Sequence, residues 1–87
     1  MREIIIHCPS IPSMAALHEL LARELDFPDW YGRNLDALHD CLTALSGKTR
    51  IIFLHFPELP FPSAGLLRVL RDSEQENDQL EISFVIN

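Results

Sequence analysis

Two aspartates and a histidine recur at helical spacing in the middle of the chain. Asp36, His39, Asp40 and Thr43 stand at positions i, i+3, i+4 and i+7, which a helix places on one side. Two carboxylates and an imidazole in this arrangement could hold a metal ion or act as an acid–base pair. The carboxylates could also take the place of phosphate groups against the arginines and lysines of a basic partner.

An enzyme needs more than this one helix face. The sequence supplies no activated nucleophile, no phosphate-binding loop and no second cluster of ligands, and His7, His18 and His55 fall on other elements. We expect His18 to be a surface residue of its helix that packs near the loop, and not a ligand. The residues therefore favour a binding surface without a metal, a cofactor or a catalytic residue. A small metal or acid–base enzyme that uses Asp36, His39 and Asp40 is the least favoured alternative.

An aromatic loop precedes the acidic helix. The only tryptophan and the only tyrosine of the chain lie side by side in the segment Pro28-Asp29-Trp30-Tyr31-Gly32. We expect one ring in the core and the other exposed beside the acidic helix face. Exposed aromatic side chains next to charged groups are typical of protein–protein interfaces.

The charge balance argues against nucleic acid as a partner. The 87 residues contain 13 acidic and 7 basic side chains, for a formal net charge of -6. A nucleic-acid-binding protein needs a basic surface that displaces counterions from phosphates. A protein with a basic surface is the better partner.

The acidic side chains gather in two segments. Residues 26–40 hold four aspartates against one arginine, and residues 72–81 hold five acids and no basic residue, namely Asp72, Glu74, Glu76, Asp78 and Glu81. Acids near a helix C-terminus are unfavourable because of the helix dipole, and such local conflicts are more common at functional sites. We expect Glu74 and Glu76 to be solvated.

Three short apolar runs predict strands, at Glu3–His7, Ile51–Leu54 and Ile82–Ile86. The first two do not alternate polar and apolar residues, so we expect both faces of the sheet to be covered.

Helical patterns fill the intervals between the strands. Ser13 is the predicted N-cap of a helix that ends near Asp26, and Asn34 is the predicted N-cap of a helix over Leu35–Leu45. A third helix is predicted from about Ser63 to Glu76, with Leu66, Leu67 and Leu70 inward. The order β-α-α-β-α-β requires parallel strands joined by crossovers. The sequence thus predicts an α/β fold with a three-stranded parallel sheet, as one domain over residues 1–87.

The cysteines and the apolar runs indicate a cytoplasmic protein. Cys8 and Cys41 lack CxxC spacing and are expected as free thiols in a reducing compartment, although a Cys8–Cys41 bridge is compatible with the sequence. The N-terminal apolar run is too short for a signal peptide. No run reaches the roughly 18 apolar residues of a membrane span, so no membrane partner is expected.

One segment carries a family resemblance. Residues 27–43, with the sequence FPDWYGRNLDALHDCLT, resemble the signature segment of the barstar family, the intracellular inhibitors of a secreted bacterial ribonuclease. The resemblance extends weakly over nearly the whole chain. It implies an inhibitor that plugs the active site of a basic microbial ribonuclease of the guanyl type in a one-to-one complex.

The resemblance also implies roles for single residues. Asp40 would take the place of a substrate phosphate against the catalytic arginines and histidine of the enzyme, and Asp36 would be the second charged contact. Trp30 stands where the family has a tyrosine that packs on that histidine. The other contact residues that we expect on the loop and the second helix are Gly32, Asn34, Leu35, His39, Thr43 and Ala44. Near the end of the third helix, Asp72 is the best match to a family glutamate that adds a further charge pair, with Glu74 and Glu76 close by.

Departures from the family pattern leave the identity of the ribonuclease open. They occur at Trp30, Arg33, His39, Leu45, Gly47 and Lys48. The alternative function is an acidic adaptor that binds another basic protein, because such an adaptor would share every feature except the target.

Overall fold

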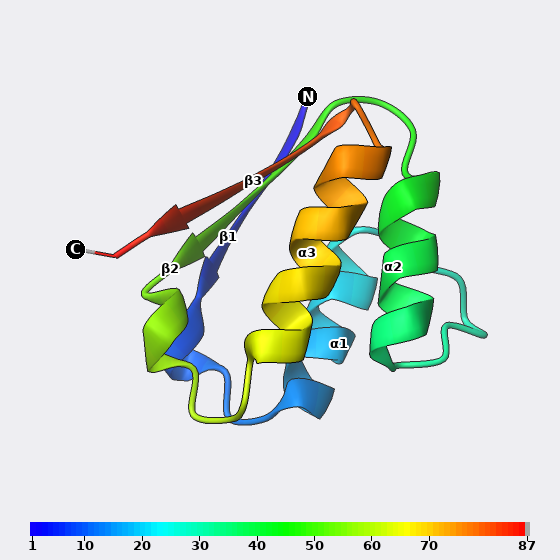
Figure 1. Cartoon of the computed structure of the whole chain (residues 1–87). Coiled ribbons are helices and arrows are strands. Elements are labelled where there is room, and N and C mark those ends of the chain that lie inside the picture. The colour runs from blue at the N-terminus through cyan, green and yellow to red at the C-terminus, as the bar shows by residue number, and fades with distance from the viewer. Residues whose placement is uncertain (87) are drawn as a thin grey trace.

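The computed structural model describes residues 1–86. Within them lie strands β1 (Arg2–His7), β2 (Thr49–Leu54) and β3 (Leu80–Val85) and helices α1 (Met14–Glu24), α2 (Leu35–Ala44) and α3 (Ala64–Glu76). Two short 3-10 turns, Cys8–Ser10 and Phe56–Glu58, follow the first two strands. The predicted order β-α-α-β-α-β is confirmed (Figure 1).

The sheet has the order β1-β2-β3, with both pairings parallel. Helices connect the strands because parallel neighbours cannot be joined by a tight turn. Ile4 pairs with Ile51, which pairs with Ile82. These three isoleucines are buried and form one row of the core.

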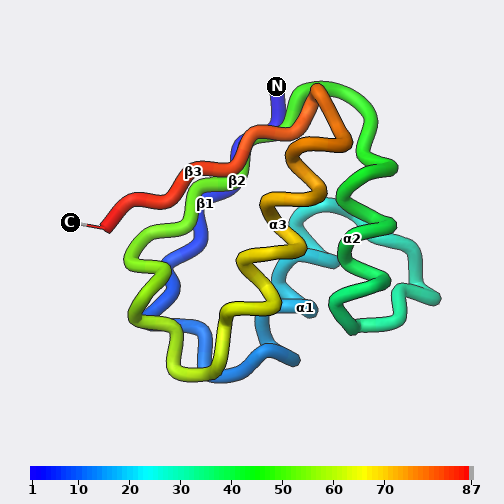
Figure 2. The backbone as a smooth tube through the Cα atoms, in the orientation of Figure 1, coloured from blue at the N-terminus to red at the C-terminus, as the bar shows by residue number. Residues whose placement is uncertain are grey.

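All three helices cover the same face of the sheet, and the opposite face is open (Figures 1 and 2). Ile4 and Ile6 are buried against the helices, whereas Ile5 between them is 60% exposed. The prediction that both faces are covered is therefore wrong. The two crossovers step across the sheet in one direction, and right-handed crossovers that do so place their helices on one side.

The core lies between the sheet and the helices, and its largest fully buried side chain is Phe53 of β2. Leu66 and Leu70 of α3 are buried as predicted. Leu67 is 37% exposed, so its predicted inward position is wrong. The inward stripe continues instead to the buried Ser73, because residues three and four apart share a helix face.

Contacts with α3 hold α2 at both ends. At its start, the side chain of Leu35 packs against Gly65, where an added Cβ atom would lie 3.1 Å from Leu35 Cδ1. At its end, Asn77 Nδ2 donates hydrogen bonds to the carbonyl oxygens of Leu42 and Leu45, at 2.9 and 3.1 Å. These carbonyls are among those that a helix end leaves without an internal partner. The orientation of α2 is thus set by α3.

Both cysteines are free thiols, as expected. Burial raises the pKa of Cys8 to about 11 and also raises the pKa of Cys41. A raised pKa keeps a thiol protonated and unreactive at neutral pH. Among residues 1–86, no helix has the length and apolar character needed to cross a membrane.

Candidate protein-binding site

Asn34 starts α2, as predicted. Its Oδ1 accepts a hydrogen bond from the backbone N–H of Ala37 at 2.8 Å, and its Nδ2 donates to the carbonyl oxygen of Gly32 at 3.3 Å. The first bond satisfies one of the free N–H groups of the first helical turn. The N-cap also ties the helix to the loop that precedes it.

Arg33 fixes the turn just before that cap. It adopts a left-handed backbone conformation with φ of 53°, and its guanidinium pairs with the carboxylate of Glu19 on α1. Its Nη1 also donates to the carbonyl oxygen of Tyr31 at 2.9 Å. The guanidinium lowers the pKa of Glu19, since it stabilises the charged carboxylate. The loop is therefore attached to α1 as well as to α2.

Of the two neighbouring aromatic rings of the loop, one is buried in the core and the other is exposed to solvent. Tyr31 is 3% exposed, with its ring centroid 4.9 Å from that of Phe27, whereas Trp30 is 82% exposed. The prediction of one buried and one exposed ring is confirmed. The buried ring anchors the loop, and the exposed indole is available to a partner.

His18 forms the hydrogen bond that the buried tyrosine requires. The hydroxyl of Tyr31 lies 2.6 Å from His18 Nδ1, so His18 packs against the loop as predicted. His18 is buried, however, so its predicted surface position is wrong. Burial lowers the pKa of His18 and raises the pKa of Tyr31 to about 12, because both charged forms would lose hydration. The sequence carried a signal for this contact, since a buried tyrosine hydroxyl usually has a partner.

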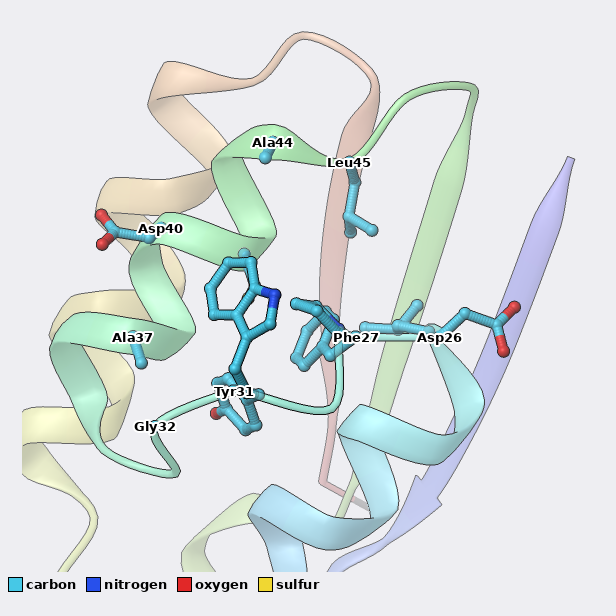
Figure 3. A pocket seen from close by; sticks show the side chains of 12 residues that line it. Asp26, Phe27, Tyr31, Gly32, Ala37, Asp40, Ala44 and Leu45 are labelled. Atoms are coloured by element: carbon cyan, nitrogen blue, oxygen red, sulfur yellow. The ribbon is translucent and has the colours of Figure 1, made fainter.

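A groove of about 440 Å³ separates the loop from α2. Figure 3 shows Ala37, Asp40 and Ala44 on the α2 side, and Phe27 and Tyr31 on the loop side. The carboxylate of Asp40 points outward from α2. Trp30, Gly32 and Cys41 also line the groove. The structure thus brings together four of the residues predicted to bind a partner, namely Trp30, Gly32, Asp40 and Ala44.

The other predicted residues of α2 lie outside this groove. Asp36 is exposed in the first turn, where a carboxylate is favourable beside the positive end of the helix. The Thr43 hydroxyl donates to the backbone oxygens of His39 and Asp40, at 2.9 and 3.1 Å. The side chains of Asn34, Leu35 and Thr43 thus all make contacts within the chain that support α2.

His39 faces α3 and pairs with Glu76, which the sequence analysis named only as a neighbour of the expected contact Asp72. Its Nε2 lies 2.9 Å from Glu76 Oε2, and the Glu76 side chain remains more than half exposed. Asp72 is also exposed, one helical turn earlier. The acid of α3 that adjoins α2 is thus Glu76. No signal along the sequence shows which residues of two helices meet.

Glu74 has a structural contact instead of the expected solvation. It is half-buried, and its Oε2 accepts a hydrogen bond from the backbone N–H of Ile82 at 2.8 Å. This bond occupies an N–H group of β3, which is an edge strand. The prediction of a solvated side chain is therefore wrong for Glu74. It is correct for Glu76, which is exposed.

The geometry does not assemble an enzyme-like cluster. His39 is turned toward Glu76, and within residues 1–86 no three His, Cys, Asp or Glu side chains are arranged to hold a metal ion. The exposed indole of Trp30 beside an apolar groove is instead typical of a protein-binding surface, because such surfaces are enriched in aromatic side chains.

Comparison with known proteins identifies the family. The family model described as "Barstar (barnase inhibitor)" matches residues 1–87. The chain belongs to the barstar family. The resemblance of residues 27–43 to this family is thereby confirmed, and a family of inhibitors agrees with the expectation that the chain is not an enzyme.

A relative is known from Bacillus subtilis (strain 168). It is named "Putative ribonuclease inhibitor YrdF" and is 58% identical to this chain over 43 residues. The aligned segment covers 49% of this chain and 47% of the relative, so the match spans about half the length of that protein.

Proposed function

We propose that this barstar-family chain inhibits a basic, secreted microbial ribonuclease of the guanyl type by filling its RNA-binding cleft in a one-to-one complex. The observation that carries the proposal is that Asp40 and the exposed Trp30 line the same groove. A carboxylate at such a place can meet the cations that bind a phosphate of RNA. The indole of Trp30, which lines the same groove, supplies the large apolar contact that protein interfaces concentrate at their centre.

The acidic side chains of α2 are available to a partner. Asp36 and Asp40 are both exposed, and neither forms an ion pair within the described part of the chain. Their charge is therefore not neutralised internally. The net charge of -6 adds a field that attracts a basic enzyme over a longer range.

The loop and α2 are held in place before binding. Asn34 caps the helix, Arg33 connects the loop to α1, and Asn77 connects the end of α2 to α3. A surface that is already ordered loses less conformational entropy when it binds. We infer that Gly32, Asn34, Leu35, Thr43 and Ala44 contribute the shape of this surface and that Asp36 and Asp40 contribute its charge.

Three further residues are proposed at the border of the contact. The exposed Asp72 and Glu76 extend the acidic surface onto α3, and His39 connects that surface to α2 through its pair with Glu76. We propose the cytoplasm as the compartment, since the two free thiols suit a reducing environment.

Titration into a panel of small guanyl-type ribonucleases, barnase included, tests the proposal. RNA cleavage should fall to zero at one equivalent, with kinetics competitive with RNA. Trp30→Ala should weaken inhibition, whereas Leu67→Ala, which also shortens an exposed apolar side chain but on α3, should leave it unchanged. Non-competitive kinetics would refute the plug, and inhibition of no member of the panel would favour the adaptor.

A further inference from the structure

The groove beside Trp30 has a second acidic end. Asp26 lies where α1 passes into the loop and lines the groove, as Asp40 does from α2. Figure 3 shows the two aspartates on opposite sides of the groove, with Phe27 between them and the carboxylate of Asp26 at the outer rim. Of residues 1–86, those that line the groove include no lysine, arginine or histidine. The groove is therefore mainly apolar, with a negative charge at each end.

The carboxylate of Asp26 forms no ion pair within the described part of the chain, although two basic side chains lie near it. Arg2 Nη1 donates instead to the carbonyl oxygen of Leu25, at 3.3 Å. Arg23, in the last turn of α1, pairs with Glu24. Asp26 is exposed, so its charge is available to a partner.

The local structure does not require an aspartate at position 26. Asp26 has a left-handed backbone conformation with φ of 56°, and the N–H of Phe27 donates to the carbonyl oxygen of Ala22 at 2.9 Å. This is the position after a helix end at which glycine is most common. A negative charge at a helix C-terminus is also unfavourable. A residue that conflicts with its local structure in this way is more common at functional sites.

We propose that the groove receives one lysine or arginine side chain from the rim of the ribonuclease cleft, with its charged group at Asp26; this contact rests on the proposed function. The aliphatic stem of such a side chain packs on the apolar walls and on the indole of Trp30, and its charged group stays at the solvated rim. There it donates a charge-assisted hydrogen bond to the Asp26 carboxylate. Asp26 thus selects ribonucleases that carry a basic residue at this point.

The chemistry of the groove favours a basic side chain over other occupants. An apolar side chain would desolvate the Asp26 carboxylate without supplying a partner. An acidic side chain would be repelled by Asp26 and Asp40. The volume of about 440 Å³ lies in the range of clefts that hold a small ligand, so one long side chain fits. Because Asp40 lines the same groove, the enzyme surface that covers Asp40 also reaches Asp26.

Asp26→Asn tests this contact, with Asp29→Asn as the matched control. Both variants replace an exposed aspartate of the loop region by its neutral isostere, but Asp29 does not line the groove. In stopped-flow measurements with an inhibited ribonuclease, both should slow association to the same small extent, because each removes one negative charge. Only Asp26→Asn should speed dissociation, by about tenfold, because it removes a hydrogen bond between two charged groups.

Double-mutant cycles identify the partner of Asp26. Each lysine and arginine that borders the RNA cleft of the ribonuclease is replaced by alanine, and each replacement is combined with Asp26→Asn. One of these residues should show a coupling of at least about threefold in the dissociation constant with Asp26 and none with Asp29.

The possible outcomes separate this contact from the proposed function. Equal dissociation rates for Asp26→Asn and Asp29→Asn, or cycles without coupling, in a chain that inhibits the ribonuclease would overturn the groove contact and leave the proposed function intact. A midpoint of thermal unfolding that falls for Asp26→Asn alone would show that this carboxylate serves the chain itself, and would also overturn the contact. Inhibition of no ribonuclease would overturn the proposed function and, with it, this contact.

Discussion

Replacing Asp40 by alanine should separate the binding function of this carboxylate from any role in stability. The Asp40 side chain is exposed on α2 and forms no ion pair within residues 1–86. Alanine has the higher helix propensity, so the free energy of unfolding should change by less than about 0.7 kcal/mol. Thermal unfolding of the free chain checks this first expectation.

The effect of Asp40→Ala on the complex should be much larger. In the proposed complex, removal of this carboxylate leaves cations of the ribonuclease buried without a partner. Losing one member of a buried charge pair costs about 2–5 kcal/mol, a range to which complexes of this same family contributed. This cost corresponds to a rise in the dissociation constant of about 30-fold to several thousandfold. The change should appear mainly as faster dissociation.

Asp78→Ala is the matched control, because it makes the same chemical change at an exposed acid beyond the end of α3. Such a charge is screened within about 8 Å at physiological salt, so its removal should slow association slightly and leave dissociation unchanged. Stopped-flow association and dissociation at two salt concentrations, with a ribonuclease inhibited in the panel, measure both rates. If Asp40→Ala changes only the association rate, as the control does, Asp40 does not take the place of a phosphate.

Three further predictions concern the contacts that position the site. Tyr31→Phe should lower the free energy of unfolding by about 1–3 kcal/mol, because it leaves the buried His18 Nδ1 without its partner; equal urea midpoints for the variant and the wild type would contradict this. Because burial lowers the pKa of His18, the unfolded chain binds the proton more readily, so stability is complete above about pH 6.5 and falls as the pH drops below it. His18→Gln should flatten that part of the stability–pH profile, and an unchanged profile would refute the assignment to His18. Asn34→Ala should cost about 1 kcal/mol of stability through the lost N-cap, whereas Asn34→Asp should retain it; equal losses in urea denaturation for both variants would exclude the cap as the cause.

Local patterns in the sequence were sufficient to predict the elements. The N-caps at Ser13 and Asn34 and the three strands depend on residues that are close together in the sequence, and each was confirmed. The parallel order followed from chain connectivity, because a strand–helix–strand unit permits little else. The family followed from residues 27–43, a continuous segment.

Contacts between distant segments were decided only by the tertiary structure. Composition predicted that one of Trp30 and Tyr31 is buried, but only the packing of α1 against the loop shows that it is Tyr31, with His18 as its partner. In the same way, the pairing of His39 with Glu76 depends on how α2 and α3 are aligned. Three consecutive isoleucines in β1 indicated a strand covered on both faces, yet the hand of the crossovers places every helix on one side and leaves Ile5 exposed. Hydrophobic character along the chain specifies which side chains can be buried, whereas the number of layers that the chain forms determines which of them are.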